Sequence, residues 1–113
     1  MRNESDGVAG AVIEALADPV RRQVVTLLSD GPMRAGQLAG ATGMSAPAMS
    51  RHLRVLRAAG VIEDERIDAD ARARVFRLRR APLVAVQAWL DQIQAGWNEQ
   101  LASYKRHVEG KQQ

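Results

Sequence analysis

The chain has 113 residues, enough for one domain with a modest hydrophobic core, so we expect a dimer. It contains no cysteine, which excludes disulfides, thiolate redox switches and thiolate metal sites. The sixteen basic residues outnumber the thirteen acidic ones, and the excess lies in the middle, where residues 21–80 carry twelve arginines against six acids. A positive field confined to one stretch of a small domain indicates a surface that faces phosphate.

The first part of the chain predicts two helices. Residues 8–17 form the first, with four apolar side chains on one side, namely Val8, Val12, Ile13 and Leu16. The second covers residues 19–29. Asp18 caps it, and Pro19 occupies the first helical position, where the missing N–H costs nothing.

A weaker third helix follows over residues 34–42. Gly36 and Gly40 each cost about 1 kcal/mol relative to alanine, so packing through Leu38 must hold it. Gly43 then makes a tight turn.

The fourth helix, residues 45–59, carries the most informative pattern. Ser45 is a good N-cap, and Gly60 lies where a left-handed residue ends a helix. One apolar stripe runs along it, made of Met49, Leu53 and Leu56. The other faces carry short polar and cationic residues, namely Ser50, Arg51, Arg54 and Arg57. Such a helix can anchor in a small core and enter the major groove of DNA.

After the fourth helix the spacing of the apolar residues changes from helical to alternating. Residues 61–67 and 73–79 predict two strands, joined by a tip at residues 68–71. A last helix covers residues 81–108, with apolar residues that step by three or four and Trp89 beside them: Val86, Leu90, Ile93, Trp97, Leu101, Tyr104 and Val108. No apolar run approaches the roughly 18 residues of a membrane helix and no signal peptide is recognisable, so we expect a cytoplasmic protein with no membrane partner.

This order predicts a mainly α fold with a small β-hairpin, a winged helix-turn-helix of five helices and a two-stranded wing. The segments ALADPVRRQVVTLLSDGP, GQLA, MSAPAMSRHLRVLRAAGVIE and RVFRL together resemble the ArsR-type family of bacterial winged-helix repressors. The resemblance covers roughly residues 12–105. The Trp-rich last helix is similar to a branch of that family with no obvious metal site.

The resemblance implies a homodimeric regulator that binds double-stranded DNA. The two recognition helices of the dimer would lie in successive major grooves of an imperfect palindromic operator. The bound dimer would repress transcription of its own or a neighbouring operon. In this family the binding of an effector typically releases the DNA. The sequence does not identify a small-molecule effector for this chain. We expect flexible ends at residues 1–7 and 109–113, around one DNA-binding and dimerisation domain at residues 8–108.

The resemblance also implies which residues touch bases. They come from the first two turns of the fourth helix: Ala46, Pro47, Ser50 and Arg51. Arg51 can fork onto guanine O6 and N7, and Ser50 can bond several base edges. Ala46 departs from the polar residue often found there, which weakens direct readout. Arg54 lies deeper along the helix and is a further candidate for DNA contact.

Phosphate contacts are expected at the start of the third and fourth helices, where free N–H groups favour anions, from Arg34 and Ser45. Thr42 is a lesser candidate. Three wing arginines suit the minor groove or the DNA backbone, namely Arg66, Arg72 and Arg74. Asp68 and Asp70 at the tip would repel phosphate, so either they orient the arginines or the tip stays clear of DNA. His52 either reaches a phosphate or bonds a neighbouring helix.

The dimer seam implied by the resemblance uses the first and last helices. Its expected residues are Val12, Leu16, Val86, Trp89, Leu90, Ile93, Trp97, Leu101 and Tyr104. Aromatic residues are strong interface anchors. The same aromatics could instead line an apolar cleft near the last helix that takes a hydrophobic effector.

Other functions find less support in the sequence. The family's metal site on the last helix needs paired Asp and His ligands, and only Asp91 and His107 are present, so we expect no metal and no cofactor. No nucleophile–base pair is recognisable, so we expect no enzymatic activity. A winged helix that binds an acidic protein partner is the alternative, although such a surface needs no base reader beside Arg51.

Overall fold

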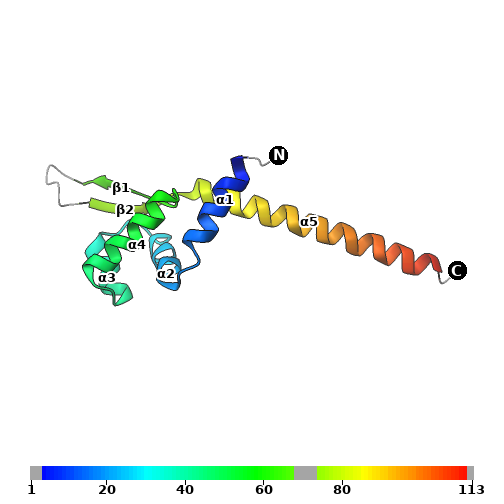
Figure 1. Cartoon of the computed structure of the whole chain (residues 1–113), viewed down its shortest axis with the longest axis horizontal. Helices are drawn as coiled ribbons and strands as arrows, with labels where there is room; N and C mark the ends of the chain where they lie inside the picture. Colours follow the sequence, from blue (N-terminus) through cyan, green and yellow to red (C-terminus); the bar gives the residue numbers. More distant parts are fainter. Residues whose placement is uncertain (1–3, 68–73, 112–113) are drawn as a thin grey trace.

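The computed structural model describes residues 4–67 and 74–111. Within these ranges the elements follow the predicted order: α1 (Glu4–Ala15), α2 (Pro19–Leu28), α3 (Ala35–Thr42), α4 (Ala46–Ala58), β1 (Ile62–Arg66), β2 (Arg74–Leu78) and α5 (Arg80–Lys111). Helices α2, α3 and α4 form one body, the hairpin extends from it on one side, and α5 projects on the other (Figure 1). This arrangement confirms the predicted winged helix-turn-helix.

The bounds of two helices, α1 and α5, differ most from the prediction. Helix α1 begins at Glu4 and ends at Ala15, while α5 runs from Arg80 to Lys111. Helix α1 ends two residues before its predicted end, where the Ala17 N–H donates to the Glu14 carbonyl at 3.2 Å and tightens the last turn; Asp18 (φ −95°, ψ 132°) then caps α2. Helical structure therefore reaches into both of the ranges that the sequence predicted as flexible ends.

The predicted helix caps are confirmed. Asp18 Oδ1 accepts hydrogen bonds from the backbone N–H groups of Val20 at 2.8 Å and Arg21 at 3.2 Å. Ser45 Oγ accepts one from the N–H of Ala48 at 3.2 Å. Gly60 has φ of +78° after α4, the left-handed conformation that glycine adopts without strain. These local signals place the start of α2 and both ends of α4.

The core lies between α1, α2, α3, α4 and the start of the hairpin. Met49, Leu53 and Leu56 are buried, as the apolar stripe predicted, and Leu38 is fully buried beneath α3. The rest of the buried cluster comes from the neighbouring elements: Val12, Ala15, Val24, Leu28, Ala39, Val61 and Ile62. Helix α4 is thus held by its apolar stripe with its other faces outward.

The hairpin is antiparallel and pairs Ile62 with Leu78 and Arg66 with Arg74. It is fastened to the body by Met33, whose backbone N–H and C=O both bond Phe76, at 3.0 and 2.8 Å. The predicted tip, with Asp68, Asp70 and Arg72, lies outside the described residues.

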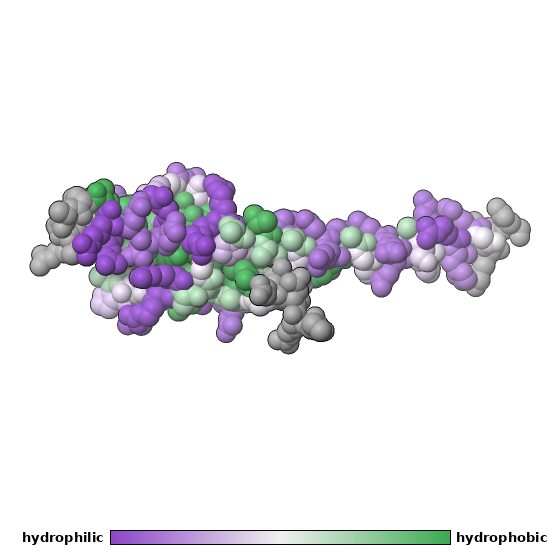
Figure 2. Space-filling model, turned by 90° about the horizontal axis from the view of Figure 1, so that it is seen from above, coloured by the Kyte–Doolittle hydropathy of each residue, from purple (hydrophilic) through white to green (hydrophobic). Residues whose placement is uncertain are grey.

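Helix α5 gives the chain its elongated shape. The radius of gyration is 20.0 Å, whereas about 13 Å is expected for a compact domain of this length. Helix α1 packs against the first part of α5, and the rest of α5 stands away from the body (Figure 1). Hydrophobic surface gathers where the body joins α5 (Figure 2). Within the described ranges, no helix has both the length and the hydropathy needed to cross a membrane.

Candidate nucleic-acid interface

The first two turns of α4 present the predicted base readers to solvent. Ala46, Pro47, Ser50 and Arg51 are all exposed, while Met49 between them is buried. The buried stripe therefore fixes the rotation of α4, and with it the direction in which these four residues face.

Two adjoining grooves bring the predicted DNA-contact residues of separate elements together. One, of about 570 Å³, lies between α4 and β2 and is lined by Ser50 and Arg54 beside Phe76. The other, of about 540 Å³, is lined by Arg34 and Arg74, and it also borders Phe76. Because both grooves share Phe76, a continuous surface runs from α4 past the start of α3 to the hairpin.

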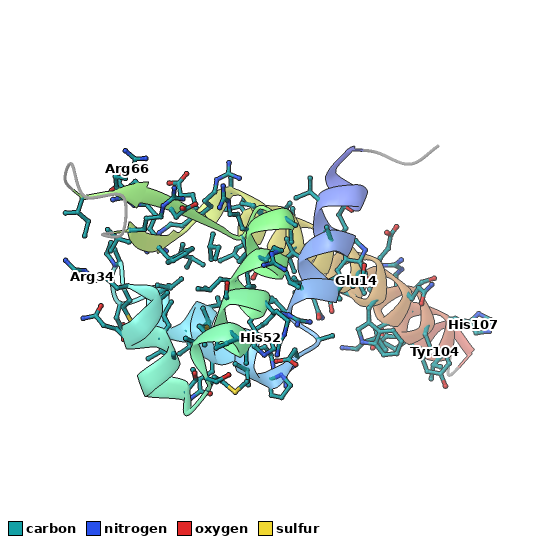
Figure 3. The ribbon with its side chains drawn as sticks, turned by 60° about the vertical axis from the view of Figure 1, so that its left-hand side comes forward. Glu14, Arg34, His52, Arg66, Tyr104 and His107 are labelled. Atoms are coloured by element: carbon teal, nitrogen blue, oxygen red, sulfur yellow. The ribbon has the colours of Figure 1, made fainter. Side chains whose placement is uncertain are left out.

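Arg34 keeps its guanidinium available for this surface. It is the N-cap residue of α3, but its side chain makes no capping bond, and Gln37 Oε1 instead accepts a bond from the Arg34 N–H at 2.9 Å. Arg34 is exposed at the same end of the molecule as Arg66, far from Tyr104 on α5 (Figure 3). Ser45 accepts the Ala48 N–H through oxygen, which leaves its hydroxyl hydrogen free to donate.

Thr42 is a correction. The Thr42 side chain is half-buried, and its hydroxyl donates to the Leu38 carbonyl at 2.8 Å. A hydroxyl has one hydrogen, so this bond leaves none to donate to a phosphate. The predicted role of Thr42 in DNA contact is therefore withdrawn.

The hairpin carries ion pairs that the sequence analysis missed. Asp64 Oδ2 lies 2.7 Å from Arg74 Nη1, and Asp64 Oδ1 lies 3.3 Å from Arg57 Nη1. On the other face of the hairpin, the acids of β1 pair with arginines of β2 or just beyond it, Glu65 with Arg77 and Glu63 with Arg79. The hairpin is therefore much less positive than its arginine count indicates.

A signal for these pairs exists in the sequence. The run Glu63–Glu65 lies on one predicted strand, and three arginines lie on the other, Arg74, Arg77 and Arg79. Opposite charges on neighbouring strands attract across a sheet. Which arginine meets which acid depends on the register, and only the structure supplies it.

His52 bonds a neighbouring helix, which answers one question that the sequence left open. Its Nδ1 lies 3.4 Å from Arg21 Nη1 and 4.0 Å from Asp18 Oδ1, at the start of α2 (Figure 3). Partial burial raises the pKa of Asp18. The backbone N–H bonds from Arg21 and Val20 and the electrostatic influence of the neighbouring His52 and Arg21 outweigh this effect and hold the pKa of Asp18 below its ordinary value. The contact ties α4 to the start of α2.

Helix α5 presents an uncovered apolar stripe. In the single chain, six predicted seam residues are exposed: Trp89, Leu90, Ile93, Trp97, Leu101 and Tyr104. Leu16 and Val86 are half-buried against the chain's own core. Val12 is a correction, because it is fully buried in that core and has no surface to offer a partner. On α1, Val8 and Ile13 are exposed instead.

No three His, Asp or Glu side chains of the described residues lie close enough together to hold a metal ion. Asp91 and His107, the Asp and His that the sequence leaves on the last helix, are sixteen residues apart on the one helix α5, about 24 Å along its axis.

Comparison with known proteins places these features in a wider context. Residues 18–64 match the family described as "Bacterial regulatory protein, arsR family". The chain is 36% identical to the HTH-type transcriptional regulator Rv2034 of Mycobacterium tuberculosis over 85% of this chain and 84% of that protein. It is 44% identical to the transcriptional repressor SdpR of Bacillus subtilis over 49% of this chain and 61% of that protein.

A solved structure supports the same relationship. The ArsR-like transcriptional regulator from Rhodococcus sp. RHA1 superposes with a TM-score of 0.78 and 28% sequence identity, covering 92% of this chain and 95% of that one. The similarity therefore spans both the helical body and much of α5.

Proposed function

The chain belongs to the ArsR family of bacterial regulatory proteins, and we propose that it is a homodimeric, sequence-specific transcriptional repressor that reads DNA through α4. One observation carries the proposal: the exposed polar start of α4, with Ser50 and Arg51, is continuous with Arg34 and the hairpin through two adjoining grooves. A docking surface for the major groove needs such a protruding helix flanked by phosphate contacts.

Base reading falls to the first two turns of α4. Arg51 is exposed and has no ion pair with another described residue, so its two donor groups can fork onto guanine. The Ser50 hydroxyl both donates and accepts, which suits several base edges. Arg54, one turn beyond Ser50, extends the contact toward the DNA backbone.

Phosphate contacts position the protein. The free N–H groups at the start of α3 favour anions, and Arg34 lies there. At the start of α4, Pro47 has no N–H and Ser45 caps Ala48, so the contact falls to the Ser45 hydroxyl hydrogen and the positive end of the helix dipole. Arg66 adds a positive charge on the hairpin at the same end of the molecule (Figure 3). These contacts fix the register of the protein on DNA without themselves reading sequence.

The homodimer follows from the surface of α5. Six large side chains on one helix stay exposed in the single chain, and a second copy of α5 would cover them. A two-fold axis would place the two α4 helices in successive major grooves, which predicts an imperfect palindromic operator. SdpR, to which the chain is similar, is a transcriptional repressor. This similarity supports the view that DNA binding by the chain blocks transcription of its own or a neighbouring operon.

The test is binding of the purified protein to the DNA upstream of its own gene. Fluorescence anisotropy over a salt series should give nanomolar affinity, a steep salt slope and a specificity of at least about 10³ over a scrambled duplex. The matched variant Arg51→Ala should lose discrimination and remain folded. Equal and weak binding to both duplexes would contradict the proposal that this DNA contains an operator.

A further inference from the structure

Asp64 occupies an unusual place for an acid. Its side chain is 7% exposed and lies on the face of β1 that also carries the buried Ile62, opposite Phe76. A carboxylate with so little exposure to water is costly unless it is paired, and Asp64 has two partners from two elements, Arg57 of α4 and Arg74 of β2. These ion pairs join the recognition helix to the wing.

Both partners belong to the grooved surface assigned above to DNA. Arg57 lines the groove that contains Ser50, and its side chain is 60% exposed. Arg74 lines the groove that contains Arg34, and its side chain is 46% exposed. Without Asp64, two mobile guanidinium groups would face the phosphates at this position. With it, two positive charges and one negative charge leave a net charge of +1.

We propose that Asp64 is a positioning residue of the DNA interface, which ties Arg57 and Arg74 to each other and thereby limits how strongly the protein binds DNA of any sequence. The inference rests on the proposed function. Affinity that is independent of sequence grows with the number of phosphates that lysine and arginine neutralise. An acid held between two arginines at the interface lowers that number by one per subunit.

The opposite face of the hairpin supplies a matched control. Side chains alternate along a strand, so Glu65 faces away from Asp64, and it is exposed and paired with Arg77. The variants Asp64→Asn and Glu65→Gln change the net charge by the same amount, one on each face. Asparagine also keeps nearly the shape of aspartate.

The experiment measures full-length protein binding to a labelled duplex of mixed sequence by fluorescence anisotropy over a salt series. The slope of log K against log salt should be steeper for Asp64→Asn than for wild type by about 0.9 per DNA-bound subunit. Glu65→Gln should change it less. Adding Arg74→Gln to Asp64→Asn should return the slope toward the wild-type value. Circular dichroism establishes that each variant is folded.

A second pair of variants does not depend on the folding of Asp64→Asn. Arg34 and Arg74 line the same groove, but only Arg74 is tied to an acid among the described residues. Arg34→Gln should therefore reduce the salt slope by about 0.9 per bound subunit. Because Arg57 and Arg74 share Asp64 and together leave a net charge of +1, the double variant Arg57→Gln/Arg74→Gln should also reduce the slope by only about 0.9 per bound subunit. A loss from the double variant about twice that from Arg34→Gln would overturn the role of Asp64.

The outcomes separate this inference from the proposed function. Wild-type protein that binds no duplex at any salt concentration refutes both. Wild-type protein that binds DNA, together with an unchanged or shallower slope for Asp64→Asn, refutes only the role of Asp64.

Discussion

Replacement of Trp97 by glutamate tests the assignment of the α5 stripe to a dimer seam. Trp97 is 57% exposed in the single chain and lies in the middle of the six predicted seam residues of α5 that are exposed. In a two-fold dimer its indole would be covered by the partner helix. A carboxylate at this position would have to be buried without a partner charge or would keep the two helices apart.

The magnitude follows from the exposed area. A tryptophan side chain can bury up to about 250 Å², so an exposed fraction of 57% corresponds to roughly 140 Å² per subunit. At about 25 cal/mol per Å², covering this area contributes roughly 3.5 kcal/mol per subunit, or roughly 7 kcal/mol per dimer, as an upper limit. We therefore expect Trp97→Glu to raise the dimer dissociation constant by about three to five powers of ten.

Sedimentation velocity over a concentration series from nanomolar to micromolar measures this constant. The matched control is Gln92→Glu, which adds the same charge to an exposed residue about 140° around the helix from Trp97. At protein concentrations at which Trp97→Glu is monomeric, Gln92→Glu should remain dimeric. If Trp97→Glu instead sediments as a dimer at wild-type concentrations, the seam does not include this face of α5 and the reasoning fails.

Three further predictions concern DNA reading, the core and pH. Arg51→Ala should lower discrimination at one base pair per half-site by ~1–3 kcal/mol, measured by anisotropy on single-base operator variants, and equal discrimination would remove Arg51 from base reading. Leu38→Ala should lower the free energy of unfolding by ~2–5 kcal/mol in urea titrations, because Leu38 is fully buried; a loss below 1 kcal/mol would contradict its place in the core. The lowered pKa of Asp18 stabilises the folded state above the ordinary pKa of 3.8, and this stabilisation is lost as the pH falls through the folded-state pKa. The free energy of unfolding at acid pH should therefore depend less on pH in Asp18→Asn than in wild type.

Features that depend on local chemistry were predictable from the sequence. Asp18 and Ser45 cap helices through their own side chains, and Gly60 ends α4 because only glycine adopts its conformation without strain. The apolar stripe of α4 fixes its rotation by periodicity alone. The exposure of Ser50 and Arg51 therefore followed from residues within one helix.

Features that depend on which surfaces meet were not predictable. Periodicity shows that α1 has apolar residues, but α1 has the chain's own core on one side and solvent on the other. Val12 faces the core, whereas Val8 and Ile13 face outward, and the sequence pattern does not separate the two sets. The pairs of Asp64 likewise depend on strand register and on the distance from α4 to the hairpin.

The structure also connects the DNA-reading helix to the proposed seam through a short joint. Arg79, which directly precedes α5, donates its backbone N–H to the Val61 carbonyl at 2.8 Å and its guanidinium to the Gly60 carbonyl at 3.2 Å. A Cβ added at Gly60 would lie 3.3 Å from Arg79 Nη1 and 3.9 Å from Pro82 Cγ, so the end of α4 approaches the start of α5 closely.

This joint limits how a dimer of α5 helices can present α4. The Gly60 and Val61 carbonyls hold the chain just before α5, and Pro82 within the first turn of α5 is buried. A change in the angle between two paired α5 helices would therefore be carried to α4 through bonded backbone rather than through a loose linker. In the proposed dimer, the distance between the two α4 helices, and thus the expected spacing of operator half-sites, would be set jointly by the α5 seam and by the Gly60–Arg79 contact.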